Sequence, residues 1–239
     1  MDRRQCLLTG GAVVSGLLGG VGAATAAATA RPTEGSHGRP PVSRRQDGGP
    51  DGTEPIETSY SGTGATVGLD VRIERRGPIV FDMRHGGSGS FVVDVVDADG
   101  TRIERTVNYT GPWSGELAYD IEPGAYELRV QAGGSWSITL VQQPLYELAD
   151  VGTTPPVEFE GSSPQLYGPI DFSAPRTLSF TSDGEDHNVL ILHDASGERL
   201  SVLVNETSPV ETSIEISIAQ DVGWLSVDTD GGSYTLSVE

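Results

Sequence analysis

The chain repeats itself at an offset of 97 residues, and this internal repeat constrains its fold more than any other feature. The stretch FVVDVVDADG at residues 91–100 aligns with NVLILHDASG at 188–197, and NYTGP at 108–112 aligns with NETSP at 205–209. One inserted residue near Asp230 moves the offset to 98 and aligns Trp136 with Tyr234. The alignment indicates two copies of one structural unit, each long enough to form a small domain.

Short apolar-alternating runs fill each copy. They recur at intervals of eight to twelve residues with Gly, Asp, Ser and Pro between them, and no stretch keeps a helical period. We therefore expect an all-β chain in which each copy closes as an antiparallel two-sheet β-sandwich, with a jelly roll as the nearest alternative. The expected inward positions are Phe91, Val93, Val95, Leu117, Tyr119, Ile121, Trp136, Ile138 and Leu140, then Leu190, Leu192, Ile214, Ile216, Ile218, Tyr234, Leu236 and Val238.

Changes in composition divide the chain into five segments. Residues between the apolar N-terminus and the first copy have little to bury, so they cannot offset the entropy cost of ordering. The expected segments are a signal peptide at 1–30, a disordered linker at 31–55, β-sandwich repeats at 56–143 and 157–239, and a Pro-rich linker at 144–156.

Both copies end in a turn-strand-turn-strand pattern, written in the first copy as EPGAYELRVQAGGSWSITL at residues 122–140. This ending resembles the final hairpin of pre-peptidase C-terminal-type sandwiches, which are accessory domains of secreted enzymes. The resemblance covers the last third of each copy, and the second copy has QDVG at 220–223 in place of the PGAY turn. It implies an accessory or binding role.

The N-terminus resembles a twin-arginine (Tat) export signal. Arg3 and Arg4 precede a mildly apolar run rich in Gly and Ala, which closes with the small-residue pattern Ala28-Thr29-Ala30. We expect cleavage after Ala30 and a secreted or cell-surface protein without a transmembrane anchor in its mature form. Retention of the segment as an anchor is the alternative.

The charge is strongly negative. The formal net charge is −19, and all 15 basic side chains are arginine. Such a surface repels nucleic acid and anionic lipid, so we expect neither as a partner. The composition resembles that of proteins from halophilic archaea, in which high salt screens repulsion between surface charges. An ordinary acidic protein from a GC-rich genome is the alternative.

No residue pattern points to catalysis or to a bound metal. The acidic turns around Asp97 and Asp230 lack EF-hand spacing, and the only cysteine, Cys6, lies in the expected signal peptide. His187 and His193 stand too far apart along an extended strand to share a metal, and we expect His193 to be a partly buried strand residue. We therefore expect no catalytic residue, no metal site and no cofactor.

Two tryptophans are candidate ligand contacts. Trp224 aligns with Glu127 at an outward position, and Trp113 follows the NYTGP stretch, where the second copy has Val210. An exposed indole ring can stack on a sugar, so Trp113 and Trp224 predict a carbohydrate- or ligand-binding surface. The alternative for Trp224 is that it covers the junction between the two copies. A purely structural accessory module is the leading interpretation, with cell-surface glycans or other surface proteins as partners.

The aligned NYTGP and NETSP stretches each contain an N-glycosylation sequon. The second and fourth residues of the stretch differ between the copies, whereas Asn, Thr and Pro are the same in both. We expect Asn108 and Asn205 to lie in exposed loops at equivalent ends of the two sandwiches and to carry N-linked glycans. The alternative is that Asn and Thr cap a turn that the proline then ends.

Overall fold

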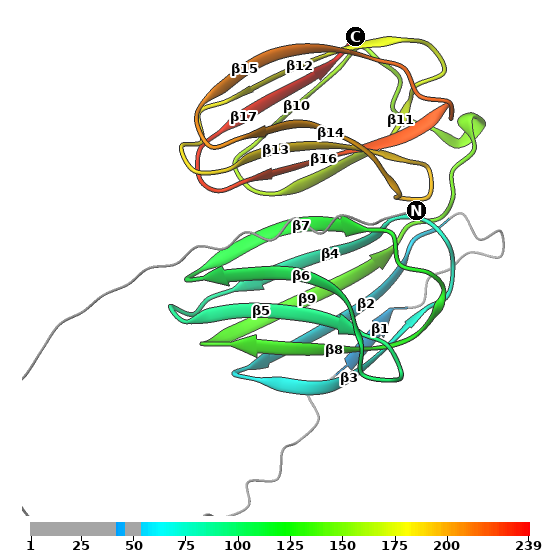
Figure 1. Ribbon diagram of the computed structural model, residues 1–239. Coiled ribbons are helices and arrows are strands. Elements are labelled where there is room, and N and C mark those ends of the chain that lie inside the picture. The colour runs from blue at the N-terminus through cyan, green and yellow to red at the C-terminus, as the bar shows by residue number, and fades with distance from the viewer. Residues whose placement is uncertain (1–41, 46–53) are drawn as a thin grey trace, which may run out of the picture. The chain divides into compact units, whose positions relative to one another are not determined.

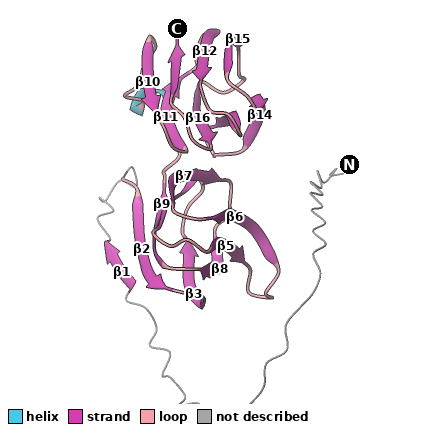
Figure 2. Cartoon of the chain, turned by 90° about the vertical axis from the view of Figure 1, so that its left-hand side faces the viewer, coloured by secondary structure: helices cyan, strands magenta, loops and turns pink. Residues whose placement is uncertain are grey.

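The computed structural model describes residues 42–45 and 54–239. Within this part of the chain every regular element is a β-strand except one short 3-10 helix, η1 (Leu148–Asp150), which Figure 2 shows in cyan. The strands form two sandwich-like units, the first sandwich (β1–β9) and the second sandwich (β10–β17). The expected all-β class with two antiparallel sandwiches is confirmed.

The first sandwich has a sheet in the order β1-β2-β9-β4-β7 and a second sheet in the order β3-β8-β5-β6 (Figure 1). Every pairing in these sheets is antiparallel. The alternation of the eight strands from β2 to β9 between the two sheets is that of a jelly roll. Their bounds are β2 Ile56–Thr63, β3 Thr66–Ile73, β4 Ile79–His85, β5 Ser90–Val96, β6 Arg102–Thr110, β7 Trp113–Tyr119, β8 Gly124–Ala132 and β9 Ser135–Gln142.

The second sandwich repeats this topology strand for strand. Its sheets have the orders β10-β17-β12-β15 and β11-β16-β13-β14, so β10 takes the place of β2 and β17 the place of β9. The bounds are β10 Val157–Gly161, β11 Gln165–Asp171, β12 Arg176–Ser182, β13 Asn188–Asp194, β14 Arg199–Glu206, β15 Val210–Ile216, β16 Val222–Thr229 and β17 Tyr234–Val238. The register follows the sequence repeat: Val93 pairs with Val130, and Leu190 with Val227, 97 residues later in each strand.

Part of the expected linker at 31–55 is a strand. Residues Val42–Arg45 form β1, which pairs with β2 in antiparallel register from Val42 with Tyr60 to Arg45 with Glu57. Without β1, β2 would be an edge strand with unpaired backbone groups, and a short extended segment can satisfy them.

Each sandwich encloses one apolar core drawn from both of its sheets. The largest fully buried side chains of the first sandwich include Phe81, Met83 and Phe91, and those of the second include Phe180 and Leu190. Most of the expected inward positions are buried, as period-two alternation requires. Leu117, Tyr119, Ile214 and Ile218 are only partly buried and pack against the edges of their cores.

The DADG and DASG stretches form equivalent hairpin turns. The Asp97 carboxylate accepts hydrogen bonds from the backbone amides of Asp99 and Thr101, and the Asp194 carboxylate accepts them from Ser196 and Glu198. Gly100 and Gly197 close the two turns at φ values of +79° and +89°, which glycine adopts without a steric penalty.

The expected signal peptide, with Cys6 and the Ala30 cleavage site, lies outside the described residues. Within residues 42–45 and 54–239, no helix has the length and hydropathy needed to cross a bilayer.

Candidate functional site

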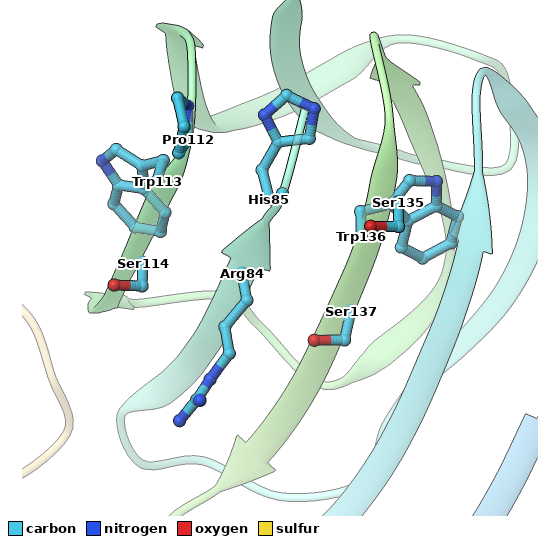
Figure 3. A pocket seen from close by; sticks show the side chains of 9 residues that line it. Arg84, His85, Pro112, Trp113, Ser114, Ser135, Trp136 and Ser137 are labelled. Atoms are coloured by element: carbon cyan, nitrogen blue, oxygen red, sulfur yellow. The ribbon is translucent and has the colours of Figure 1, made fainter. Parts of the chain in front are cut away.

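An open groove of about 540 Å³ lies at one end of the five-stranded sheet of the first sandwich (Figure 3). Residues from β4, β7 and β9 and from the turns beside them line it. They are Arg84, His85, Gly86, Pro112, Trp113, Ser114, Ser135, Trp136 and Ser137.

Antiparallel register assembles the groove from two rows of side chains. His85, at the end of β4, pairs with Trp113 of β7 on one side and with Trp136 of β9 on the other. The next row has Arg84 between Ser114 and Ser137, as Figure 3 shows. Because successive side chains of a strand point to opposite faces, the Trp–His–Trp row belongs to the core face and the Ser–Arg–Ser row to the outer face.

His85 and Trp136 form a rigid floor. His85 is 3% exposed, and its ring stacks on Phe91 with centroids 4.9 Å apart and planes 8° apart. Its Nδ1 lies 2.7 Å from the Gly111 carbonyl oxygen, so Nδ1 carries a proton and donates it. The indole N–H of Trp136 donates to the Gly64 carbonyl at 3.0 Å. These bonds fix both rings before any ligand arrives.

The His85 Nε2 is buried and has no hydrogen-bond partner among the described residues. A serine nucleophile needs its hydroxyl within hydrogen-bond reach of a base. No described serine hydroxyl forms that bond with His85, whose imidazole is held by Phe91 and Gly111 instead. The groove therefore does not present a paired nucleophile and base.

The rim of the groove offers unpaired donors. Trp113 is half-buried, and one part of its ring packs near Phe91 with centroids 6.3 Å apart. Its indole N–H makes no hydrogen bond in the described chain and is not among the buried unsatisfied atoms, so it faces solvent. Arg84, Ser114, Ser135 and Ser137 are exposed, and the Arg84 guanidinium forms no ion pair with a described carboxylate. The groove can thus donate hydrogen bonds beside an accessible aromatic surface.

The expectation of an exposed Trp224 was wrong. This side chain, in β16, is 3% exposed. Its ring lies 5.9 Å from that of Tyr146, between centroids, and a Cβ at Gly168 would lie 2.8 Å from the indole. The outward position of Trp224 is therefore covered by Tyr146 and by the backbone at Gly168, where the missing side chain lets the indole approach closely. Its indole N–H is buried without a partner, and the side chain lies outside the groove of the first sandwich. Trp224 instead lines a second cavity of about 360 Å³ together with Asp82 and Glu116.

Asn108 and Asn205 are both exposed, but they lie in strands and not in loops. They occupy equivalent positions in the edge strands β6 and β14, opposite Val92 and Val189. Neither side-chain amide makes a hydrogen bond within the described chain, so turn capping does not account for the repeated asparagine. The turn that follows each one is held from elsewhere, by His85 to the Gly111 carbonyl and by Asn188 to the Ser208 carbonyl.

The acidic turns have structural partners. Asp94 pairs with Arg105 at 2.8 Å, and Asp228 with His187 at 3.3 Å, an interaction that raises the pKa of His187. His193 is buried, as expected, and desolvation lowers its pKa. Among the described residues no group of three His, Cys, Asp or Glu side chains is placed to hold a metal ion. His37 lies outside these residues.

Sequence reasoning missed Arg84 and His85. Arg84 is exposed and His85 is buried, as the period-two alternation of β4 requires. The sequence of the first copy taken alone indicates no role for either residue. The signal lies in the repeat: Arg84, His85 and Trp113 all differ in type from their equivalents Thr181, Ser182 and Val210. The register brings these three differing positions together at one strand end.

Comparisons with known proteins indicate no family for this chain. No protein-family model matches the chain, and no curated protein matches it. Solved structures that resemble it include a conserved protein of unknown function from Pseudomonas aeruginosa PAO1, with 11% identity over 83% of this chain and 87% of that chain and a TM-score of 0.27. HutD from Pseudomonas fluorescens SBW25 has 11% identity over 77% of this chain and 78% of that chain, with a TM-score of 0.25. Similarity this weak supports no statement about function.

Proposed function

We propose that the protein is a non-enzymatic accessory module, exported to the cell surface or beyond, that binds carbohydrate through the groove of the first sandwich. One observation carries the proposal. The half-buried ring of Trp113 lines the same groove as the Arg84 side chain, which forms no ion pair with a described carboxylate, and three exposed serines.

This combination suits a sugar. The C–H face of a pyranose stacks on an indole ring, and its hydroxyl and ring oxygens accept hydrogen bonds from guanidinium, indole N–H and hydroxyl donors. Trp113 is held near Phe91 on its core side, so stacking costs little side-chain entropy. Of the two candidate tryptophans, only Trp113 takes part in the proposed binding site.

A glycan array probed with the full chain tests binding. We expect Trp113→Val, which installs the residue of the second copy, to lower affinity about tenfold or more through lost stacking. Trp224→Phe is the matched control, because Trp224 is buried outside the groove, and it should leave binding unchanged. If the wild-type chain binds no glycan, the second candidate function remains: a purely structural spacer, favoured by the two separate apolar cores.

Export and salt adaptation support the surface location. The twin arginine, the small-residue pattern ending at Ala30 and the lysine-free, acidic composition all favour a Tat passenger of a salt-adapted organism. We expect the melting temperature to rise from low to molar NaCl as screening removes self-repulsion. A melting temperature independent of salt would contradict the adaptation, and a cytoplasmic fraction holding all of the protein would contradict export.

Glycosylation of Asn108 and Asn205 is part of the same proposal. Both amides are exposed and unbonded, so a folded passenger presents them to an enzyme outside the membrane. Intact-mass analysis of protein from the native host should show two glycans, and Asn108→Gln and Asn205→Gln should each remove one. An unmodified wild-type mass would refute it.

A further inference from the structure

The Arg84 side chain gives the groove a cation on a strongly acidic protein. Four described arginines, namely Arg76, Arg105, Arg129 and Arg176, pair with carboxylates of the protein. Arg84 forms no ion pair with a described carboxylate, and the same holds for Arg72, Arg102 and Arg199. Of these four, only Arg84 lines the groove. Arg84 lines the groove, and a guanidinium carries a planar fork of N–H donors that matches the two oxygens of a carboxylate.

The neighbours of Arg84 add donors and leave one direction open. Ser114 and Ser137 stand directly across from it on β7 and β9. Asp82 and Glu116 face each other on the same outer surface two residues further from the strand end. Because two residues of a strand span about 6.6 Å, Asp82 and Glu116 lie one such step from the Arg84 row, on the side away from the strand end.

From this arrangement we propose that the groove selects acidic carbohydrates, with Arg84 holding a uronate carboxylate while Trp113 stacks on a sugar ring; the inference rests on the carbohydrate binding proposed above. The chain's negative charge repels anions at long range, which high salt screens, whereas a fork-to-carboxylate hydrogen bond acts at contact. The second sandwich lacks the feature, since the equivalent row is Glu211, Thr181 and Thr235, without a cation and with a carboxylate.

Calorimetric titration of the full chain tests the selection. The probes are trimers of galacturonate, mannuronate and glucuronate, each beside its carboxyl-reduced counterpart, so that only the charge differs within a pair. We expect at least one uronate trimer to bind about tenfold more tightly than its reduced counterpart, and Arg84→Gln to remove that difference by weakening uronate binding more than binding of the reduced trimer. Arg84→Lys should restore part of it, because it keeps the charge and loses the fork.

Arg102→Gln is the matched control. Arg102 is exposed in β6 of the same sandwich, so this change removes one positive charge away from the groove. Equal affinity within every pair, or an Arg84→Gln effect no larger than that of Arg102→Gln, would overturn the selection. If neutral trimers still bind and lose affinity in Trp113→Val, the proposed function stands without the selection. Absence of binding to the whole panel would overturn both proposals.

Discussion

The two sandwiches share a topology and a register but close the same strand end with different chemistry. In the first, the row across three strands is Trp113, His85 and Trp136. In the second, the equivalent row is Val210, Ser182 and Tyr234. The two copies therefore share a backbone arrangement but differ in the side chains of this row.

The turns next to this row, at Gly111 in the first sandwich and Ser208 in the second, are held by different side chains. In the first sandwich His85 donates to the Gly111 carbonyl and stacks on Phe91. In the second, Asn188 occupies the position of Phe91 and donates to the Ser208 carbonyl. Both turns keep a hydrogen bond to their carbonyl. The donor lies on β4 in the first sandwich and on β13 in the second, and β13 corresponds to β5, in the sheet that faces β4. A stacked pair in one sandwich is thus replaced by a hydrogen-bonded amide in the other.

The largest expected effect comes from removing the stacked ring. Phe91 is fully buried between His85 and the core, so Phe91→Ala should lower the free energy of unfolding by about 3–5 kcal/mol through lost burial and a new cavity. Urea denaturation in molar NaCl, followed by tryptophan fluorescence, measures it. A loss below about 1 kcal/mol would mean that the site collapses around the smaller side chain.

Removing the amide should cost somewhat less. The Asn188 side chain donates to the Gly184 and Ser208 carbonyls and accepts from the Ser182 and Thr229 hydroxyls. Asn188→Ala leaves these buried groups unpaired, and we expect a loss of about 2–3 kcal/mol in the same assay. Asn205→Ala, at an exposed and unbonded asparagine, should stay within about 0.5 kcal/mol. Similar effects of the two substitutions would contradict a stabilising role for the amide network.

Both sandwiches keep one feature of this end unchanged: a glycine opposite an aromatic ring. Gly62 pairs with Trp136, and Gly161 with Tyr234. A Cβ at Gly62 would lie 2.6 Å from the indole, and one at Gly161 would overlap the tyrosine ring. Because overpacking displaces a ring held by a hydrogen bond, Gly62→Ala and Gly161→Ala should each cost about 1–2 kcal/mol.

Gly152→Ala is the control for these two substitutions, since no atom lies within 4 Å of its added Cβ. Thermal unfolding of the three variants is sufficient to compare them. Neutral behaviour at Gly62 together with a loss at Gly161 would show that the rings are held differently despite the shared register.

Much of the fold could be predicted from the sequence, because register in a half-buried sheet is tied to alternation. The offsets of 97 and 98 residues predicted which strands correspond, and the pairing of Trp136 with His85 and of Tyr234 with Ser182 follows them. The strand Val42–Arg45 was missed because a short pairing at a sheet edge depends on the vacancy beside β2 and not on its own apolar content.

The candidate site was only partly predictable, for a physical reason that Trp113 and Trp224 illustrate. Alternation reports which side of its own sheet a residue faces, but not what another segment places over that side. Trp113 stays half-exposed at a strand end, whereas Tyr146 and Gly168 cover Trp224. The positions of His85 and Arg84 beside Trp113 and Trp136 could not be predicted from nearby sequence. They depend on the register of β4 with β7 and β9, which are distant in sequence.

The smallest expected effects distinguish the sandwiches by pH. His187 and His193 both lie in the second sandwich, and their equivalents in the first are Ser90 and Val96. Burial lowers the pKa of His193, so the unfolded chain takes up a proton near pH 6.5 that the folded chain refuses. Its contribution to stability is therefore lost as the pH falls below about 6.5.

His187 acts in the opposite direction. Its hydrogen bond to Asp228 raises its pKa, so its contribution is fully present below pH 6.5 and is lost as the pH rises through the raised value. Both partners are about 40% exposed, at 43% and 40%, and screening makes this contribution small. The buried histidine should therefore dominate, because its charged form cannot be solvated.

Melting temperatures between pH 5.5 and 7.5 measure the balance in wild type, His193→Gln and His187→Gln. We expect the wild type to lose stability toward pH 5.5, His193→Gln to flatten this slope and His187→Gln to steepen it. Molar NaCl should abolish the His187 effect and spare that of His193, since screening acts on an exposed ion pair and not on the desolvation of a buried ring. An unchanged slope in His193→Gln would move the acid sensitivity to other groups of the chain.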